Sequence, residues 1–469
     1  MAGNSRITEK FEYKTNILTS YDGHEQRIKT RQIPRHSLSY DYDAMTTFQA
    51  QWLKGMTRIR QTDKYYIPMW HKVVYLNEDF VEHGKALYIN TDYMYNLEGC
   101  EWIEVFVRDD PLQTGINIVR RVDHFTNNAI ILKKQIDRPM YKANCWIYPL
   151  IECSIAPQDN LQYVFANGAG LTMNFEDLLN EPRIHVPNNY RYEYDEGYYW
   201  WQLRDSIVKK EKLTTEYLKI RFPELYKEAI NKGQNPEDYI MKSFGGKKVY
   251  RDCEHFNRYN LPSTYNGYEI LWHEPWWIDD DAASLSIEKN TNRLDNETGN
   301  FVYDLKNSNS YDTIAFETYM GNVKMVNNMI KFFNRMGGMF KAFYCPTWVN
   351  DFTPKWGIQF GKNTIYTELT VTYKMYATNT RKKSIVVFTK DYQSYIFDVA
   401  AYATEEIDGK WYGKIVLAKD SNITIPVERI EMISYLDLVR FSDDALTLNY
   451  EANDVANVTL SMKEVDDIN

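Results

Sequence analysis

Short segments in which apolar and polar residues alternate recur along most of the chain. Such alternation is typical of strands with one buried face, and several short strands in close succession favour a small sandwich or barrel. In the first part of the chain these segments lie at about 101–108, 115–122, 129–132 and 145–151. In the last part they lie at about 365–373, 384–388, 395–402, 411–417 and 430–441. The pattern therefore predicts a mainly β protein.

A Tyr-x-Pro-x-Trp pattern occurs twice. Its defined residues are Tyr66, Pro68 and Trp70 in one copy, and Tyr344, Pro346 and Trp348 in the other. The composition predicts this pattern roughly 0.03 times by chance, so its recurrence suggests an internal duplication. Each copy follows an alternating segment, at 36–42 and at 312–319. We interpret the pattern as structural, because proline fixes the backbone while the aromatic rings cover the end of a sheet.

A helix is predicted between each alternating segment and the pattern that follows it. In the second copy, one face of the helix carries Val326, Met329, Ile330, Phe333 and Met336. Gly337 and Gly338 then provide a stop signal. In the first copy, Phe48, Trp52 and Met56 recur every four residues, with Gly55 near the end. Both copies finish in a predicted hairpin, at 161–178 and 446–465, in which two alternating strands flank an Asn-rich turn.

Residues 183–262 match neither half and are predicted to form a mainly helical insert. The residues at helical intervals are Leu203, Ile207, Leu213, Tyr217 and Ile220. Pro223 is expected to interrupt this pattern, and residues 235–237 (Asn-Pro-Glu) look like a helix cap. The polar segment 287–311 predicts a hairpin or an exposed loop. We therefore predict an α+β fold, mainly β, with two duplicated sandwich-like or barrel-like halves at 1–182 and 263–469 joined by the insert.

Charge and hydropathy narrow the possible partners. The formal net charge is −9 with both signs interspersed, so no basic stripe is available to follow a phosphate backbone and we expect no direct contact with nucleic acid. No apolar stretch approaches the roughly 20 residues of a membrane span, and the first residues lack the apolar core of a signal peptide. We expect no membrane span and synthesis in a cytoplasm. The five scattered cysteines are interpreted as packing thiols.

Motifs for catalysis are not evident, and we expect no catalytic residue, no cofactor and no metal ion. The eight histidines form no HExxH group, and the chain has no GxSxG elbow and no phosphate-binding loop. The run Asp279 to Asp281 is interpreted as an acidic turn, with a calcium site as the alternative. Glu25 and Glu274 leave open a pair of carboxylates for glycoside hydrolysis, because sequence spacing does not give the separation that this mechanism requires.

Two tryptophan pairs raise the question of sugar binding. They are Trp200 with Trp201 and Trp276 with Trp277. Indole rings can form platforms for sugar faces, but packing in a core or an interface is the simpler interpretation of adjacent tryptophans. The pairs therefore remain a candidate interface or sugar platform.

Two segments resemble a family of tailed-bacteriophage minor tail proteins. The first is a Gly-x-Glu-Gln-Arg-x-x-x-Arg segment, whose residues here are Gly23, Glu25, Gln26, Arg27 and Arg31. The second is a helix, a glycine-rich break and Pro-x-Trp-x-x-Asp, whose last part here is Pro346, Trp348 and Asp351. The closing VTLSMKEV is also similar to the terminal strand of that family. The resemblance covers about two-thirds of the chain, and the predicted insert lies outside it.

The resemblance implies a distal tail or baseplate-hub component of the virion, a homo-oligomeric ring at the end of the tail tube. Its partners would be other tail proteins, namely those of the tube, the hub and the fibres, and assembly would take place in the bacterial cytoplasm. Two related β modules in one subunit would present two equivalent interfaces to such a ring. Two alternatives stay open: a receptor-binding protein at the tail tip that recognises carbohydrate, and a cell-wall hydrolase.

Overall fold

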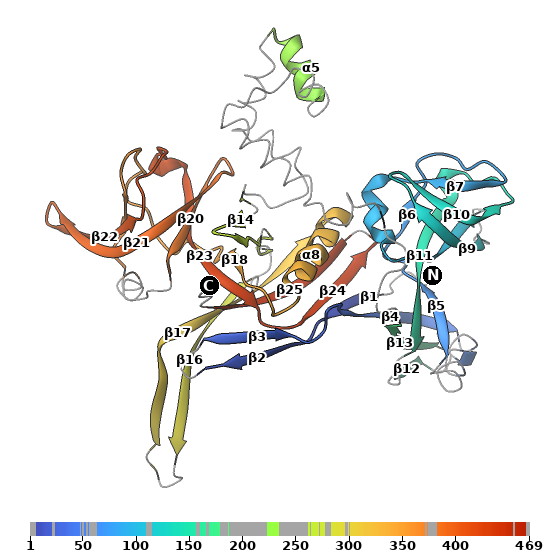
Figure 1. The fold of residues 1–469 in the computed structure, drawn as a ribbon, viewed down its shortest axis with the longest axis horizontal. Coiled ribbons are helices and arrows are strands. Elements are labelled where there is room, and N and C mark those ends of the chain that lie inside the picture. The colour runs from blue at the N-terminus through green and yellow to red at the C-terminus, as the bar shows by residue number, and fades with distance from the viewer. Residues whose placement is uncertain are drawn as a thin grey trace.

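The computed structural model describes most of the chain outside the predicted insert. The described residues are 6–20, 24–46, 48, 51–52, 55, 63–108, 115–155, 160–165, 168–178, 186, 223–233, 261–262, 264–271, 273–276, 283–295, 299, 301–370, 373, 382–453 and 455–465. Within these residues the protein is mostly β, as predicted, and 21 strands are linked into one sheet. Two lobes and a long projecting hairpin extend from the centre of this sheet (Figure 1).

The centre of the sheet is a run of strands in which every neighbouring pair is antiparallel. Its order is β12 (Asn160–Phe165), β13 (Gly168–Asp177), β4 (Arg35–Thr46), β1 (Ile7–Glu12), β24 (Ala445–Ala452), β25 (Val455–Glu464), β17 (Phe301–Met320) and β16 (Ala283–Asp295). We call the strands β12, β13, β4 and β1 the first unit, and the strands β24, β25, β17 and β16 the second unit. The pairing of β1 with β24 joins the two units.

The register of the first unit can be followed from strand to strand. Ile7 of β1 lies opposite Tyr40 of β4, and Tyr40 lies opposite Met173 of β13. Four residues further along β13, Asp177 lies opposite Cys153 of β11 (Cys145–Ile155).

The second unit repeats these pairings with the same spacing. Ala283 of β16 lies opposite Phe316 of β17, and Phe316 lies opposite Leu460 of β25. Four residues further along β25, Glu464 lies opposite Val439 of β23 (Ile430–Phe441). The strands β1, β4 and β13 thus have counterparts in β16, β17 and β25, and β11 has its counterpart in β23.

The two copies of the Tyr-x-Pro-x-Trp pattern lie at matching positions in this scheme. Pro68 ends β5 (Lys64–Pro68) opposite Leu150 of β11, which is three residues before Cys153. Pro346 ends β18 (Phe343–Pro346) opposite Leu436 of β23, which is three residues before Val439. Proline is tolerated at these strand ends because it lacks only one backbone donor.

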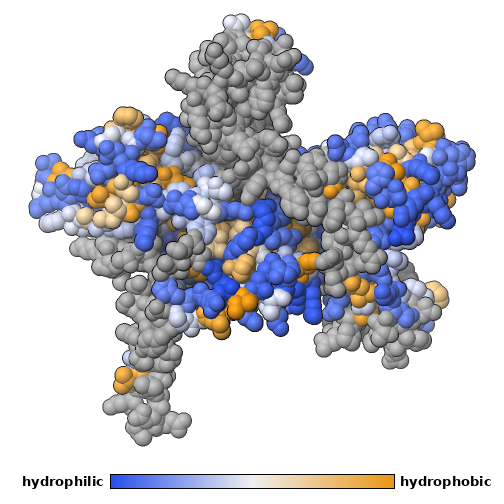
Figure 2. All heavy atoms as spheres, in the orientation of Figure 1, coloured by the Kyte–Doolittle hydropathy of each residue, from blue (hydrophilic) through white to orange (hydrophobic). Residues whose placement is uncertain are grey.

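A lobe with its own apolar core lies between each pattern and the long strand that follows it. Lobe 1 contains β6 (Val74–Tyr75), β7 (Gly84–Tyr88), η1 (Thr91–Leu97), β8 (Trp102–Arg108), β9 (Gly115–Phe125), β10 (Ala129–Ile136) and η2 (Lys142–Asn144). Lobe 2 contains β19 (Thr364–Glu368), β20 (Ser384–Thr389), β21 (Ser394–Ile407), β22 (Lys410–Leu417) and η3 (Val427–Arg429). The strands predicted in these ranges are confirmed, except that the strand predicted at 365–373 ends at Glu368. Apolar and hydrophilic side chains intermix over both lobes on the face in Figure 2.

The helix predicted in the second half is α8 (Val323–Met336). The five residues predicted on its apolar face are all buried. The side chain of Asn322 caps its start by accepting a hydrogen bond from the Met325 amide at 2.9 Å. Gly337 and Gly338 end it with φ angles of 66° and 68°, a region that favours glycine. A side chain at Gly338 would collide with the Asp444 carboxylate, so this glycine is also required by close packing.

The other predicted segments had different outcomes. Residues 48, 51, 52 and 55 are helical, but Phe48 and Trp52 are exposed and Met56 lies outside the described residues. Segment 287–311 is confirmed as a hairpin, formed by β16 and β17. Pro223 begins the helix α5 (Pro223–Asn231), because proline fits the first turn of a helix, and the pattern that it was expected to interrupt lies outside the described residues. The other helical positions of the insert and its cap at 235–237 lie outside the described residues.

No helix in the described part of the chain has the length and apolar character needed to cross a membrane.

Candidate functional site

The first copy of the repeated pattern packs against strand β4. The hydroxyl of Tyr40 donates a hydrogen bond to the carbonyl oxygen of Pro68 at 3.0 Å. The ring of Trp70 lies 5.2 Å from the ring of Tyr40. Tyr66 is 51% exposed, and its ring lies 5.7 Å from that of Trp102 in lobe 1. The pattern thus connects the end of β5 to both the first unit and lobe 1.

The second copy is more deeply buried. Tyr344 packs edge to face with Tyr265, and their ring centroids are 5.0 Å apart. Tyr265 belongs to a small hairpin of β14 (Thr264–Tyr265) and β15 (Tyr268–Glu269). Trp348 is 2% exposed, stacks on Phe388 at 5.3 Å and has a φ angle of 59°. Few residues other than glycine adopt such a φ angle, so this tryptophan is held in place by its surroundings.

The residues of the two family-like segments contact neighbouring strands. Asp351 accepts hydrogen bonds from the hydroxyl of Thr347 at 2.5 Å and from the amide of Tyr435 at 2.9 Å. Burial raises the pKa of the Asp351 carboxyl to about 6. Glu25 of β3 (Glu25–Lys29) forms a two-pronged ion pair with Arg440 of β23, at 2.7 and 2.8 Å.

The N-terminal hairpin therefore docks on the second half of the chain. It consists of β2 (Thr15–Thr19) and β3, and it leaves the central sheet between β1 and β4. Arg31, which follows β3, donates a hydrogen bond to the carbonyl oxygen of Glu12 at 2.6 Å. Gly23 lies outside the described residues.

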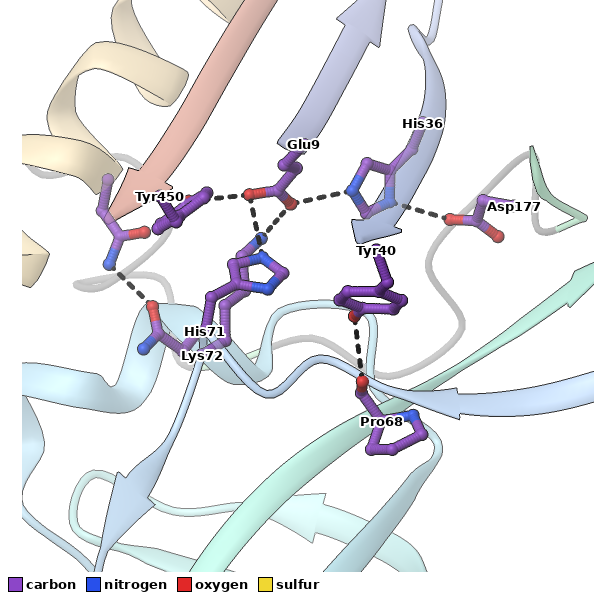
Figure 3. Close-up of polar contacts among 10 residues, drawn as sticks. Glu9, His36, Tyr40, Pro68, His71, Lys72, Asp177 and Tyr450 are labelled. Atoms are coloured by element: carbon purple, nitrogen blue, oxygen red, sulfur yellow. Dashed lines mark hydrogen bonds and ion pairs between the residues drawn. The ribbon is translucent and has the colours of Figure 1, made fainter. Parts of the chain in front are cut away.

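A buried charged cluster, which we call the Glu9 cluster, lies where the two units meet (Figure 3). The carboxylate of Glu9 on β1 is fully buried. Its oxygens contact Nε2 of His36 at 2.8 Å, Nε2 of His71 at 3.3 Å and Nζ of Lys72 at 2.5 Å. The hydroxyl of Tyr450 on β24 donates a hydrogen bond to Glu9 at 2.8 Å. Both units and the segment after the first repeated pattern contribute to this cluster.

Burial and the neighbouring charges shift the pKa values of the groups in the Glu9 cluster. Burial opposes ionisation of Glu9, but the charges of Lys72 and His71 and the hydrogen bonds from both histidines hold the pKa of Glu9 well below its usual value. Burial also acts on His36, but its contacts with Asp177 at 3.3 Å and with Glu9 raise the pKa of His36. For His71 burial prevails and lowers the pKa. The basic partners therefore favour the anionic form of Glu9, and the carboxylates of Glu9 and Asp177 favour the protonated form of His36.

A second buried charged cluster, the Lys382 cluster, lies in the second unit. The ammonium of Lys382 contacts Asp437 at 2.5 Å, Asp312 at 2.9 Å and Glu464 at 3.8 Å. Burial would lower the pKa of Lys382, but the surrounding carboxylates raise it. Burial raises the pKa of Asp437, and it raises that of Glu464 to about 7.

The two clusters occupy matching places. Asp312 lies four residues before Phe316 on β17, as His36 lies four residues before Tyr40 on β4. Glu464 lies opposite Val439, as Asp177 lies opposite Cys153. Sequence reasoning missed both clusters, because their members are far apart in the chain and only strand pairing brings them together.

The contacts of the Glu9 cluster are suited to holding β1, β4 and β24 together. Its carboxylate is surrounded by four partner groups from the protein and has no exposed surface, so a substrate in solution cannot reach it. A buried ionic network of this kind is costly to break once it has formed, because each removed partner leaves a charge without compensation. In the part of the chain that the structure describes, no group of three or more His, Cys, Asp or Glu residues has the arrangement of a metal site.

Of the predicted tryptophan pairs, only Trp276 lies within the described residues. It is 39% exposed, and its ring lies 5.1 Å from that of Tyr319. Trp200, Trp201 and Trp277 lie outside the described residues, as does the acidic run at 279–281. Glu25, one of the two carboxylates considered for hydrolysis, is occupied by its ion pair with Arg440.

Four of the five cysteines are described, and all four are buried free thiols, as predicted: Cys100, Cys145, Cys153 and Cys345. Burial raises the pKa of the first two thiols to about 12. Such thiols are poor nucleophiles at neutral pH.

In comparisons with known proteins, no family model matches this chain and no curated protein sequence matches it.

Proposed function

We propose that this protein is a structural subunit of a bacteriophage tail, a distal tail or baseplate-hub component that assembles into a ring in the virion. It would be made in the bacterial cytoplasm and would join the tail tube to tip or fibre proteins. The observation that carries this proposal is the central sheet, in which two units with the same strand order lie side by side. A chain that already contains one junction between such units is well suited to extend the arrangement to further copies.

The proposal includes a duplication of the chain. The halves 1–182 and 263–469 would each contain one unit and one sandwich-like or barrel-like lobe, with residues 183–262 as an insert between them. Three features support the duplication: the repeated pattern, the equal spacing of the strand registers and the matching places of the two buried clusters. Registers on three separate strand pairs agree with one alignment of the halves.

The family-like segments support a role in assembly. Glu25 pairs with Arg440, and Asp351 binds the backbone at Tyr435, so these residues stabilise contacts between strands that are distant in sequence. Asp444, beside Gly338, accepts hydrogen bonds from Thr15 and from the Met339 amide. Glu25 and Asp444 thus hold the N-terminal hairpin against the second half of the chain, and Asp351 stabilises a contact within that half.

Electron microscopy and mass photometry of the purified full-length chain test the proposal. We expect closed rings of one mass, and we expect mass spectrometry to detect the chain in purified particles of the phage that encodes it. A chain that remains monomeric at high concentration and is absent from those particles would overturn the proposal.

A second candidate, carbohydrate recognition at the tail tip, is favoured by an aromatic cluster on lobe 2. Trp356 is 39% exposed and packs against Tyr366 at 5.2 Å and Tyr412 at 5.0 Å. Partly exposed rings held by other rings can bind a sugar face. A glycan array would test this candidate: binding that is lost in Trp356→Ala supports it, and an array without any binder removes it.

A further inference from the structure

The two ends of the central sheet run are β12 and β16. In the described residues, β12 pairs only with β13 and β16 pairs only with β17, so each has an outer edge without a partner strand. An edge of this kind presents a row of backbone donors and acceptors that can pair with another chain. The question is therefore which strand covers each edge.

The strand β16 corresponds to β1, the strand at the junction between the units. Ile7 and Ala283 lie at equivalent positions, because they lie opposite the equivalent residues Tyr40 and Phe316. Two and four residues further along each strand, Leu285 therefore corresponds to Glu9, and Ile287 to Phe11. Glu9 and Phe11 are 0% and 9% exposed, and their strand pairs with β24. Leu285 and Ile287 are 49% and 62% exposed. The positions that are buried at the junction thus carry exposed apolar side chains on β16.

The strand β12 corresponds to β24, the other strand of the junction. Gln162 lies opposite Gly170, which is three residues before Met173. Asn449 lies opposite Asn457, which is three residues before Leu460. The sequence follows the same alignment, because Leu161 and Tyr163 match Leu448 and Tyr450.

We propose that β16 of one copy of this chain pairs antiparallel with β12 of a second copy, in the register that β1 and β24 use within the chain. Leu285 would then lie opposite Leu161 of the second copy, as Glu9 lies opposite Leu448. This inference rests on the proposed ring, and it specifies the strands and the register that build it. The occupant is a second copy because the chain already contains both surfaces of the contact, and it already uses their counterparts in β1 and β24.

The contact would be head to tail, so its repetition produces a closed ring when the rotation between neighbours divides a full turn, and a filament otherwise. At the internal junction a buried anion, Glu9, meets cations and a tyrosine. At the proposed contact the matching residue is Leu285. The contact between copies would therefore depend on apolar burial where the internal junction depends on ion pairs.

Cysteine cross-linking tests the register directly. Directly opposite residues in antiparallel strands are close enough for a disulfide. We expect that a mixture of Leu285→Cys chains and Leu161→Cys chains gives a two-chain product on a non-reducing gel under mild oxidation. Either variant alone, and a mixture of Ser284→Cys with Leu161→Cys, controls for random oxidation and for the native cysteines. A yield no higher than in these controls would overturn the proposal.

Charge substitution provides a second measurement. Leu285→Lys with Ile287→Lys places two charges at exposed positions, so the fold should persist and the rings should be lost as seen by mass photometry. The matched control is Val302→Lys with Tyr303→Lys, at positions 65% and 56% exposed on the distal part of β17, where we expect rings to remain. Rings that survive the first pair of substitutions would overturn the inference.

The failure of this inference and the failure of the proposed function can be told apart. If the chain is present in purified phage tails but gives no cross-link, only the pairing of β16 with β12 is wrong. If the cross-linked rings form but the chain is absent from the tails, the pairing stands and the tail function is wrong.

Discussion

The two buried clusters compensate buried charge in opposite ways. In the Glu9 cluster a single carboxylate on β1 lies among Lys72, His36 and His71. In the Lys382 cluster a single ammonium lies among three carboxylates. The first joins the two units of the central sheet, whereas the strands of the second, β17, β23 and β25, all belong to the second half of the chain. The outer pairs of the two clusters, His36 with Asp177 and Asp312 with Glu464, lie at matching positions, whereas the central charges Glu9 and Lys382 do not.

The difference teaches that the framework fixes where charge is buried but leaves its sign free. In the first cluster the carboxylate of Asp177 on β13 lies beside His36 on β4. In the second cluster the carboxylate of Glu464 on β25 lies beside Asp312 on β17. With the histidine, the local pair is complementary. With the aspartate, two acids meet, and Lys382 from another segment is needed to compensate them.

The largest effect is expected from removing the central cation of the second cluster. Lys382→Met leaves three buried carboxylates without compensation and should lower the free energy of unfolding by about 3–5 kcal/mol. Denaturant titration followed by circular dichroism measures this change. The control is Lys414→Met, which breaks a partly exposed pair with Glu405 and should cost about 0–1 kcal/mol. Equal effects of the two substitutions would show that the Lys382 cluster contributes little.

Removing the central anion of the first cluster should have a somewhat smaller effect. Glu9→Gln should cost about 3 kcal/mol, because Lys72 and His36 keep slight contact with solvent and His36 can release its proton. Hydrogen exchange should become faster in β1 and β24, which this cluster joins. Glu12→Gln on the same strand, whose pair with Lys10 is exposed, is the control and should leave that exchange unchanged.

The two clusters should respond to pH in opposite directions. The pKa of Glu464 is raised to about 7 in the folded chain from 4.5, so its contribution to stability is complete below pH 4.5 and is lost as the pH rises through 7. The pKa of Glu9 is lowered from 4.5, so its contribution is present above pH 4.5 and is lost as the pH falls through the folded value.

The free energy of unfolding measured from roughly pH 3 to pH 8 separates these contributions, because this range includes the pH intervals over which Glu9 and Glu464 change their contribution. Glu464→Gln should flatten the decline between pH 4.5 and pH 7. Glu9→Gln should flatten the decline below pH 4.5. If both variants keep the pH profile of the parent chain, the ionisation states assigned to the clusters are wrong.

The smallest effect concerns the hydrogen bond that crosses the junction. Tyr450→Phe removes a donor to the Glu9 carboxylate and should cost about 1.5 kcal/mol, as for other hydrogen bonds to a charged group. In the Glu9→Gln background the same substitution should cost less, because the acceptor is no longer charged. A double-mutant cycle measures the difference, and strictly additive effects would argue against direct coupling of Tyr450 to Glu9.

Local sequence pattern was sufficient for much of the secondary structure. It predicted the strands of the lobes other than β6 and β7, and it predicted the apolar face of α8 and its glycine stop, because burial of one face imposes its period on the residues and a left-handed backbone selects glycine. It did not predict that Pro223 begins a helix. The spacing of Phe48 and Trp52 indicated a helix but not the exposure of their side chains.

The sequence by itself thus determined which segments are strands or helices and that a Tyr-x-Pro-x-Trp pattern occurs twice. Only the tertiary structure decided that β1 lies between the two halves and that Glu9 meets His36, His71 and Tyr450. The physical reason is that periodicity records which face of a segment is buried, whereas the choice of partner strand depends on packing between residues hundreds of positions apart. A buried ion pair has no sequence period at all, because its members come from different strands and meet only once the register is set.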